Sequence, residues 1–351
     1  MMKFKKFNNL HYPYFIADIA ANHDGSLSRA KELIWLAKEA GADCAKFQHF
    51  EADKIVNDTE FKKIESLKTH QSEWKKSVSE IYDDYHFRRE WTEDIEKECK
   101  KAEIDFSSTP YDAEAIDLIK NITPFIKIGS GDISWLDHIE MCLKTELPIV
   151  IATGASDVDD VDRAMRLIES YGNQHCIMQC NTNYTVEKDK ISYVNLRVLE
   201  YYKEKYPKAI LGLSDHTLSP SSVYGSIAFG VKIVEKHFTD DNDRIGPDHK
   251  FAINPKNWRE MVEKSKEIVD ALGDGIKKVE KNEENAYVVQ RRSCVANKDL
   301  KKGHSVKSED IKFLRPCPEG SVQPFDHEKI VGMILTENLK ENESFKWKNL
   351  S

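Results

Sequence analysis

Residues 210–220, ILGLSDHTLSP, and residues 231–241, VKIVEKHFTDD, each run from an apolar, strand-like segment into a histidine. These histidines are His216 and His237, and each has an acidic residue within two positions. One interpretation is that both imidazoles are satisfied polar residues at the rim of a sheet. The other is that they converge on a metal, because two imidazoles from neighbouring strands, completed by water or carboxylate oxygens, suit Mn²⁺, Mg²⁺, Co²⁺ or Zn²⁺.

Six further apolar runs precede these two, and segments with helical periodicity separate most of them. The eight runs are YFIADIA (14–20), DCAKFQ (43–48), IDFSS (104–108), FIKIG (125–129), PIVIATG (148–154), CIMQCN (176–181), AILGLSD (209–215) and VKIVEKHF (231–238). Strands that alternate with helices predict a parallel sheet covered on both faces. Over about 250 residues such a sheet is expected to close into a (β/α)8 TIM barrel. A doubly wound open sheet is the alternative, weakened by the lack of a GxGxxG turn after the first run.

The composition is that of an ordinary globular protein, with 40% apolar and 32% charged residues among 351. No apolar run approaches the ~20 residues of a membrane helix, and we expect neither a membrane segment nor a signal peptide. Seven scattered cysteines without CxxC pairs predict reduced thiols in a cytoplasm. The net charge of −8 argues against a nucleic-acid partner, so an anionic substrate would need a local cluster of positive charge.

Two parts of the chain depart from the alternation of strands and helices. The connection that follows the second run, residues 51–87, is too long for one helix, and long loops on such scaffolds are often functional. After the last helical segment, a charged stretch predicts a linker and a turn-rich stretch predicts a small β-rich domain. The expected organisation is a barrel over residues 1–275, a linker over residues 276–290 and the β-rich domain over residues 291–351.

In a barrel of this kind the active-site residues come from the C-terminal ends of the strands. Two lysines, Lys46 and Lys127, point at one mouth beside small hydroxyl and glycine residues, which fits an anion site better than solvated rim positions. The other polar residues at or just after the strand ends are Asp18, Gln48, Thr109, Ser130, Asn181, Thr182, Tyr184, Ser214, Asp215, His216, Glu235 and His237.

Six motifs in consistent order resemble the N-acetylneuraminate (sialic acid) synthase family. They are IADIAANHDG, SSTPYD, KIGSGD, GLSDHT, EKHFTDD and GPDHKF. The stretch from Arg291 is similar to that family's antifreeze-protein-like module, the SAF domain. The resemblance covers nearly the whole chain. It implies condensation of phosphoenolpyruvate with an open-chain N-acetylated aldose to give a nine-carbon 2-keto acid and phosphate.

The resemblance also implies roles for individual positions. His216 and His237 would hold a divalent metal, Mn²⁺ first and Mg²⁺ or Co²⁺ as alternatives, which polarises the aldehyde of the sugar. The positions that match contacts to phosphoenolpyruvate are Lys46, Thr109, Lys127, Ser130 and Ser214, with Asn181 or Thr182 contributing. The positions that match contacts to the acceptor sugar are Gln48, Tyr184, Glu235 and Asp248.

Three positions depart from the family pattern. The first strand carries Asp18 where the pattern has glutamate, and because one carboxylate must deprotonate a water, Asp18 and Glu235 are rival bases. Ala152 stands where relatives often have serine, and RPCPEG replaces RPGxG in the terminal module. Arg315 of that motif is retained. In the family this arginine reaches across a domain-swapped homodimer to the acceptor sugar, so the resemblance implies a dimer.

Three classes of function stay open at this point. They are the phosphoenolpyruvate-dependent synthase, another metal-dependent barrel enzyme such as a class II aldolase or sugar isomerase, and a non-catalytic carbohydrate-binding protein. Lys46 and Lys127 favour the synthase, because an isomerase of a neutral sugar has no need of them. The acceptor is N-acetylmannosamine, its 6-phosphate or a 2,4-diacetamido-trideoxyhexose, and we expect residues 51–87 to shape its pocket.

Overall fold

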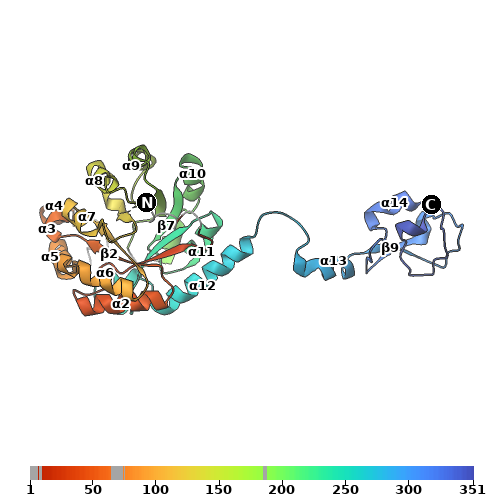
Figure 1. Ribbon diagram of the computed structural model, residues 1–351, viewed down its shortest axis with the longest axis horizontal. Helices are drawn as coiled ribbons and strands as arrows, with labels where there is room; N and C mark the ends of the chain where they lie inside the picture. Colours follow the sequence, from red (N-terminus) through yellow and green to blue (C-terminus); the bar gives the residue numbers. More distant parts are fainter. Residues whose placement is uncertain (1–6, 8–9, 65–73, 75, 185–187) are drawn as a thin grey trace. The chain divides into compact units, whose positions relative to one another are not determined.

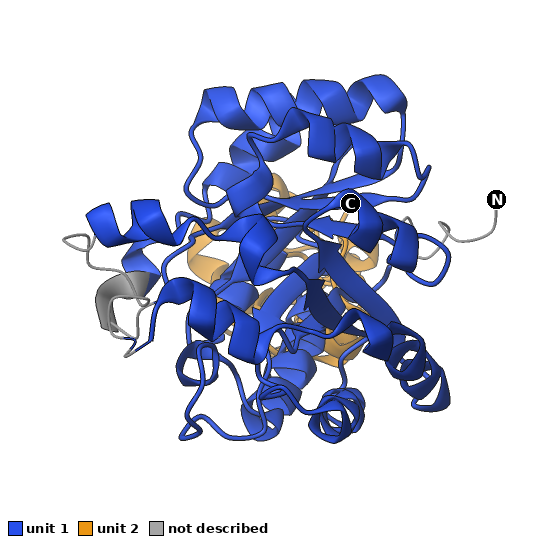
Figure 2. Cartoon of the chain, turned by 90° about the vertical axis from the view of Figure 1, so that its left-hand side faces the viewer, with its two compact units in different colours: residues 1–273 blue, residues 274–351 orange. Residues whose placement is uncertain are grey.

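The computed structural model describes residues 7, 10–64, 74, 76–184 and 188–351 (Figure 1). The chain folds into two compact units, residues 1–273 and residues 274–351, which Figure 2 colours blue and orange. We call them unit 1 and unit 2.

Unit 1 is built on an eight-stranded sheet in the order β3-β2-β1-β8-β7-β6-β5-β4. The strands are β1 (Tyr14–Asp18), β2 (Cys44–His49), β3 (Asp105–Pro110), β4 (Ile126–Ile128), β5 (Ile149–Ala152), β6 (His175–Cys180), β7 (Ile210–Asp215) and β8 (Ile233–His237). Hydrogen-bonded neighbours run parallel. At the two ends of this order, Ser107 Oγ of β3 donates to the Phe125 carbonyl beside β4 at 3.3 Å. The sheet is a nearly closed, TIM-like barrel, as predicted, and the open-sheet alternative is wrong.

Helices surround this sheet on its outer side (Figure 1). They are α2 (Leu27–Glu39), α6 (Thr92–Lys101), α7 (Ala113–Ile119), α8 (Leu136–Leu143), α9 (Val158–Tyr171), α10 (Val198–Lys205), α11 (Ser221–Ala228) and α12 (Pro255–Leu272). Their ends follow local sequence: α9 begins at a capping box of Asp157 and Asp160 and ends at Gly172, whose φ of 75° favours glycine. Helix α2 buries Leu33 and Ile34, each worth about 1.5–3 kcal/mol of hydrophobic stabilisation.

The long connection after β2 forms three short helices. They are α3 (Ala52–Ile55), α4 (Asp58–Lys63) and α5 (Val78–Tyr85), and α5 starts at a capping box of Ser77 and Glu80. None of the three reaches the ~12 residues at which an isolated helix becomes marginally stable, so tertiary contacts hold them, including those of α3 and α4 with α5. The sequence predicted a long connection here, but not its helices.

Unit 2 contains an antiparallel pair of strands, β9 (Ser293–Ala296) and β10 (Ile311–Leu314). Isolated antiparallel bridges, such as Leu300 to Leu339, extend this arrangement around a separate apolar core. The unit also includes α14 (His327–Ile330) and α13 (Glu284–Val289). Part of the predicted linker is therefore helical, and its Val288 carbonyl accepts from the Cys317 amide at 2.9 Å.

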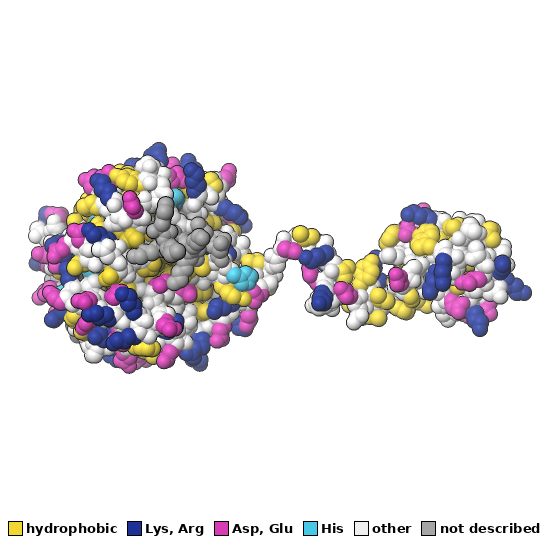
Figure 3. Space-filling model, viewed as in Figure 1, with side chains coloured by type: hydrophobic (Ala, Val, Ile, Leu, Met, Phe, Trp, Pro, Cys, Tyr) yellow, Lys and Arg dark blue, Asp and Glu magenta, His cyan; other side chains and the backbone are white. Residues whose placement is uncertain are grey.

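The surface gives two further observations. On the face drawn in Figure 3, acidic and basic side chains are interspersed over both units, without one large patch of a single sign. Within the described part of the chain, no helix has both the length and the apolar character that crossing a membrane requires.

Candidate active site

Two buried ion pairs lie inside the barrel at the C-terminal ends of its strands. Lys46 Nζ of β2 lies 2.7 Å from Asp18 Oδ2 of β1, and Lys127 Nζ of β4 lies 3.3 Å from Glu235 Oε1 of β8. All four residues are at most 4% exposed. Because a buried charge is stable only when it is paired, the four groups act as one electrostatic unit.

Lys46 keeps its positive charge in this cluster. Burial alone would lower the pKa of Lys46, but the carboxylates of Asp18 and Glu235 outweigh burial and raise the pKa above its ordinary value. Its ammonium also donates to Thr109 Oγ1 at 3.4 Å. The strand ends therefore present a fixed cation and a hydroxyl to anything bound in the mouth.

Both oxygens of Asp18 are engaged. Oδ1 accepts from the Ala20 amide at 3.2 Å, and Oδ2 accepts from Gln48 Nε2 at 3.2 Å in addition to its pairing with Lys46. Gln48 and Lys46 are two residues apart and therefore on the same side of β2, which is why both reach one carboxylate.

The two oxygens of Glu235 differ from each other. Oε1 accepts from Ser214 Oγ at 3.3 Å and pairs with Lys127. No described residue donates a hydrogen bond to Oε2, although this atom is buried. An unsatisfied buried acceptor costs about 1–3 kcal/mol, so Oε2 is set to accept from a bound water or hydroxyl.

The two histidines lie side by side at the ends of β7 and β8. Their ring centroids are 5.4 Å apart, and Tyr184 packs edge-on against both, with centroid distances of 4.5 Å to His216 and 6.0 Å to His237. His216 Nδ1 lies 3.0 Å from the Asn181 carbonyl. A carbonyl only accepts, so this contact places the proton on Nδ1 and the lone pair on Nε2.

These residues fit a divalent metal held by few protein ligands. A backbone partner that fixes the imidazole tautomer, as Asn181 does for His216, is the usual support of a metal-binding histidine. His237 Nε2 lies 3.9 Å from Asp18 Oδ2, which adds an oxygen donor nearby. Among the described residues no group of three or more His, Cys, Asp or Glu side chains is arranged as a metal site. Two imidazoles with the other positions left to water or substrate suit a catalytic ion rather than a structural one.

A set of small residues follows the neighbouring strands β4, β5 and β6. Ser130 Oγ, just after β4, lies 2.9 Å from Thr182 Oγ1, which follows β6. A Cβ placed on Gly154 would lie 1.7 Å from Thr182 Oγ1, so only glycine fits there. Cys180 is adjacent, but burial raises the pKa of its thiol, which stays protonated at neutral pH.

Asp248 and Arg315 lie outside the strand ends. Asp248 Oδ2 accepts from the Ala21 amide at 3.1 Å, which brings this loop to the turn after β1. Burial raises the pKa of Asp248 to about 6, against the opposing Ala21 amide and with help from the Asp18 carboxylate. Arg315 is an exposed residue of unit 2, next to the end of β10.

Gln48 and Asp248 also line a cavity of about 80 Å³ whose other walls are largely aromatic. Phe50, Tyr82 and Tyr111 form its centre, with ring centroids of Phe50 5.1 Å from Tyr82 and 5.9 Å from Tyr111. The sequence analysis named none of these three. Phe50 lies two residues after Gln48, Tyr82 lies in the long connection and Tyr111 directly follows β3, and these places were the only signals in the sequence.

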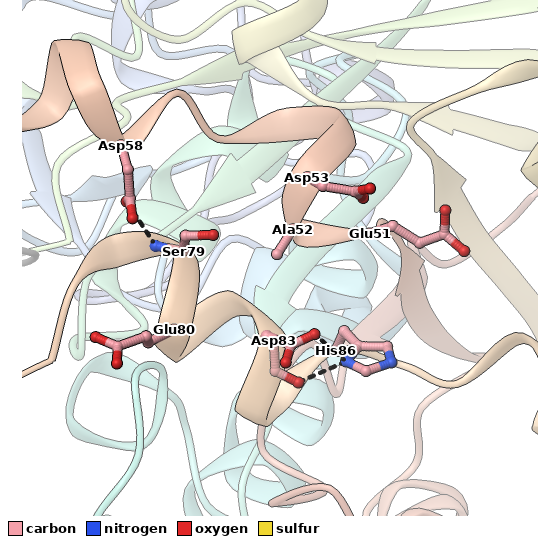
Figure 4. Close-up of a pocket in the computed structure, with 8 residues that line it drawn as sticks. All are labelled: Glu51, Ala52, Asp53, Asp58, Ser79, Glu80, Asp83 and His86. Atoms are coloured by element: carbon pink, nitrogen blue, oxygen red, sulfur yellow. Dashed lines mark hydrogen bonds and ion pairs between the residues drawn. The ribbon is translucent and has the colours of Figure 1, made fainter.

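A larger pocket of about 560 Å³ lies on the same connection (Figure 4). It is lined by Glu51, Ala52, Asp53, Asp58, Ser79, Glu80, Asp83 and His86. Asp58 accepts from the Ser79 amide at 3.1 Å and His86 contacts the Asp83 carbonyl, as drawn in Figure 4. None of the predicted site residues lines this acidic pocket, so we do not take it as the active site.

Asp215 and Lys236, the neighbours of the two histidines, form a third buried ion pair on the outer side of the sheet. Lys236 Nζ lies 2.6 Å from Asp215 Oδ2, and Ser222 Oγ of α11 donates to the same oxygen at 2.5 Å. Burial alone would raise the pKa of Asp215, but Lys236 and Ser222 lower it below its ordinary value. The pair links the two strand ends that carry His216 and His237.

We predict that Asp215→Asn lowers the free energy of unfolding by about 3–5 kcal/mol, because Lys236 would stay buried without its partner. Urea unfolding at pH 7 measures the change. Asp117→Asn is the control: its pair with Lys120 is exposed, with side-chain exposures of 70% and 42%. Such a pair is worth less than about 1 kcal/mol. Equal losses in the two variants would mean that the buried pair does not hold the strand ends.

Comparison with known proteins shows which family the chain resembles. The NeuB family model matches residues 33–277, and the SAF domain model matches residues 291–351. The N,N'-diacetyllegionaminic acid synthase of Campylobacter jejuni is 31% identical, over 93% of this chain and 97% of that protein. The human N-acetylneuraminate-9-phosphate synthase is 27% identical, over 95% of this chain and 91% of that protein.

A solved structure, the putative spore coat polysaccharide biosynthesis protein E of Chromobacterium violaceum, shares the fold. Its TM-score is 0.76 at 22% identity, and the match covers 97% of this chain and 99% of that one. The family model spans most of unit 1 and the relatives match along nearly their whole length. The chain therefore belongs to the NeuB family of nonulosonate synthases and carries a SAF domain over residues 291–351.

Proposed function

We propose that the protein condenses phosphoenolpyruvate with an open-chain N-acetylated aldose and water to give a nine-carbon 2-keto sugar acid and phosphate. N-acetylmannosamine and the 2,4-diacetamido-trideoxyhexoses, which lead to legionaminic or pseudaminic acid, are the acceptor candidates. The observation that carries the proposal is the pair of buried lysines, each matched to a carboxylate, beside two adjacent histidines.

The lysines supply the binding site for phosphoenolpyruvate. Lys46 and Lys127 are buried ammonium groups, and charge–charge attraction is stronger at a buried position than in solution. Thr109, Ser130 and Ser214 add hydroxyl donors, and Gly154 keeps the space at Thr182 open. Asn181 contributes its carbonyl to His216 and so acts on the neighbouring part of the site.

His216 and His237 would hold a divalent cation, Mn²⁺ first and Mg²⁺ or Co²⁺ as alternatives. When bound, such an ion supplies Lewis acidity to a carbonyl oxygen. Gln48, Tyr184 and Asp248 surround the space next to the two imidazoles and orient the acceptor. Tyr184 does so as a neutral phenol, because burial raises its pKa well above the ordinary value.

The reaction balances without a redox partner. C3 of phosphoenolpyruvate bonds to the aldehyde carbon, and water adds to the cationic C2 that results. One proton of that water ends on the aldehyde oxygen, which becomes a hydroxyl group. The other ends on phosphate, which leaves with its bridging oxygen as the 2-keto group forms. We assign removal of the first proton to Glu235, because its Oε2 accepts no hydrogen bond from a described residue. Asp18 is assigned the role of pairing with Lys46.

The competing proposal is a barrel aldolase or isomerase that acts without phosphoenolpyruvate. Such an enzyme would have no anionic substrate for Lys46 and Lys127 to bind. Incubation with ¹³C₃-phosphoenolpyruvate and acceptor distinguishes the two. Our proposal expects a sugar acid that carries all three labelled carbons, detected by mass spectrometry. An unlabelled sugar product would favour the aldolase or isomerase.

We also propose a cytoplasmic setting, since all seven cysteines are free thiols and six of them are buried.

Arg315 is proposed to complete the site from a second copy of the chain, in a domain-swapped homodimer. We predict that Arg315→Ala and Glu235→Gln, each nearly inactive alone, regain activity when they are refolded together. Mixed dimers then contain one site with an intact barrel and an intact arginine. Gel filtration measures dimerisation, and phosphate release measures the recovered activity. If confirmed mixed dimers show no recovered activity, the arginine is not supplied across the dimer.

A further inference from the structure

We propose that the aromatic cavity beside Gln48 and Asp248 receives the far, apolar end of the acceptor sugar. The acceptor is then an uncharged aldose that ends in methyl and acetamido groups, of the 2,4-diacetamido-trideoxyhexose type, rather than a sugar phosphate. This inference rests on the proposed function and names its substrate class.

The cavity has the size and lining for such a group. Its volume of about 80 Å³ is roughly half that of an apolar cavity that holds benzene, which leaves room for a few heavy atoms and not for a whole hexose. Phe50, Tyr82 and Tyr111 line it, with Phe50 tilted against Tyr82 and edge-on to Tyr111, and Ile55 and Tyr85 add further apolar surface. Aromatic walls with a few polar groups at one end are typical of ligand pockets.

The polar end of the cavity lies toward the reacting groups. Gln48 lines the cavity and also donates to Asp18 Oδ2 at 3.2 Å, and Asp18 pairs with Lys46. Asp248 lines the cavity and accepts from the Ala21 amide in the turn after β1. A sugar held by Gln48 and Asp248 with its carbonyl end toward the histidines therefore has its other end directed at the aromatic rings.

The charges around the cavity oppose a phosphate. Among the described residues that line it, none is lysine or arginine, and the ionisable acid is Asp248. The neighbouring pocket on the same connection adds five carboxylates, from Glu51, Asp53, Asp58, Glu80 and Asp83 (Figure 4). Against this lining a phosphate dianion would meet an apolar wall and a carboxylate, with no cation among the described lining residues to pair with, which is strongly unfavourable.

A methyl group is also favoured over a hydroxymethyl group here, though less strongly. An apolar pocket discriminates against one added hydroxyl by about 100-fold at most, because the hydroxyl loses its hydrogen bonds to water. We therefore expect three levels of activity. The diacetamido-trideoxyhexose ranks first, N-acetylmannosamine lies about 10–100-fold below it, and N-acetylmannosamine 6-phosphate ranks last.

The test measures kcat/KM for the three acceptors with the full-length protein, Mn²⁺ and phosphoenolpyruvate. Ile55→Lys places a cation in the cavity and is expected to raise the ratio of 6-phosphate to diacetamido sugar by about 10-fold or more, the effect of one added charge pair. Ile64→Lys is the matched control. Ile64 lies on the same connection, is 46% exposed and does not line the cavity, so its variant should keep the wild-type ratio.

Two results overturn the inference while leaving the proposed synthase intact: the 6-phosphate or N-acetylmannosamine as the best acceptor, or equal ratios in Ile55→Lys and Ile64→Lys. Absence of phosphate release with every acceptor contradicts the proposed function instead. In that case calorimetric binding of the three sugars decides the inference by itself. The diacetamido sugar must bind most tightly and the 6-phosphate least, and any other order refutes the assignment.

Discussion

Replacing His216 or His237 by alanine is expected to remove the metal dependence of phosphate release and to lower turnover by about 1,000-fold. The magnitude corresponds to the several kcal/mol that a Lewis-acid metal contributes to a transition state. Either change leaves one imidazole of a pair whose ring centroids are 5.4 Å apart. The measurements are metal content after dialysis against Mn²⁺ and phosphate release as a function of Mn²⁺ concentration.

His175→Ala is the control for this pair. His175 is also a buried histidine of the barrel, but it lies at the start of β6 and its Nδ1 contacts the Asn173 carbonyl. Its variant should bind metal as the wild type does, even if it is less stable. Unchanged metal content and turnover in both His216→Ala and His237→Ala would mean that the two histidines are satisfied rim residues.

The second large effect concerns the carboxylate that removes a proton from water. We expect Glu235→Gln to lower kcat by about 100- to 10,000-fold, the usual contribution of a general base. Asp18→Asn should mainly raise KM for phosphoenolpyruvate, because Asp18 holds Lys46 while both of its oxygens are already engaged.

The two substitutions are matched. Each removes one charge from one buried carboxylate–lysine pair, Glu235 with Lys127 or Asp18 with Lys46, so the loss of pairing is similar. The difference in kcat at saturating substrates then reports the base. The opposite split, with kcat lost in Asp18→Asn and kept in Glu235→Gln, would assign the base to Asp18.

The fold could be predicted from sequence because its signal is repeated. Each strand is a short apolar run between helical segments, and eight repeats leave few alternatives to a barrel. Short irregular elements carry no such redundancy. The helices α3, α4 and α5 and the helix α13 are each at most eight residues long, too short for hydrophobic periodicity to distinguish them from a loop.

The polar cluster could be predicted in part. The rule that parallel strands end at one mouth brings together Lys46, Lys127 and Glu235. In the structure they belong to two buried ion pairs, Lys46 with Asp18 and Lys127 with Glu235. Which carboxylate pairs with which lysine depends on side-chain reach across the barrel. That reach is not a property of sequence spacing, so Asp18 and Glu235 could not be told apart at that level.

Two features were invisible in the sequence for different reasons. The pairing of Asp215 with Lys236 depends on the register of β7 against β8, which puts these residues opposite each other. The aromatic cavity depends on loops: Phe50 and Tyr82 lie at the two ends of one connection and Tyr111 follows β3. Their meeting point is set by tertiary packing alone.

The most direct test of the proposed synthase is phosphate release from phosphoenolpyruvate by metal-stripped, folded protein. Mn²⁺ is then added back together with N-acetylmannosamine, its 6-phosphate or a 2,4-diacetamido-trideoxyhexose. We predict that release requires both the metal and one acceptor, and that each phosphate released matches one new nine-carbon acid. Release without an acceptor, or no release with any of the three sugars in the presence of Mn²⁺, would contradict the proposed reaction.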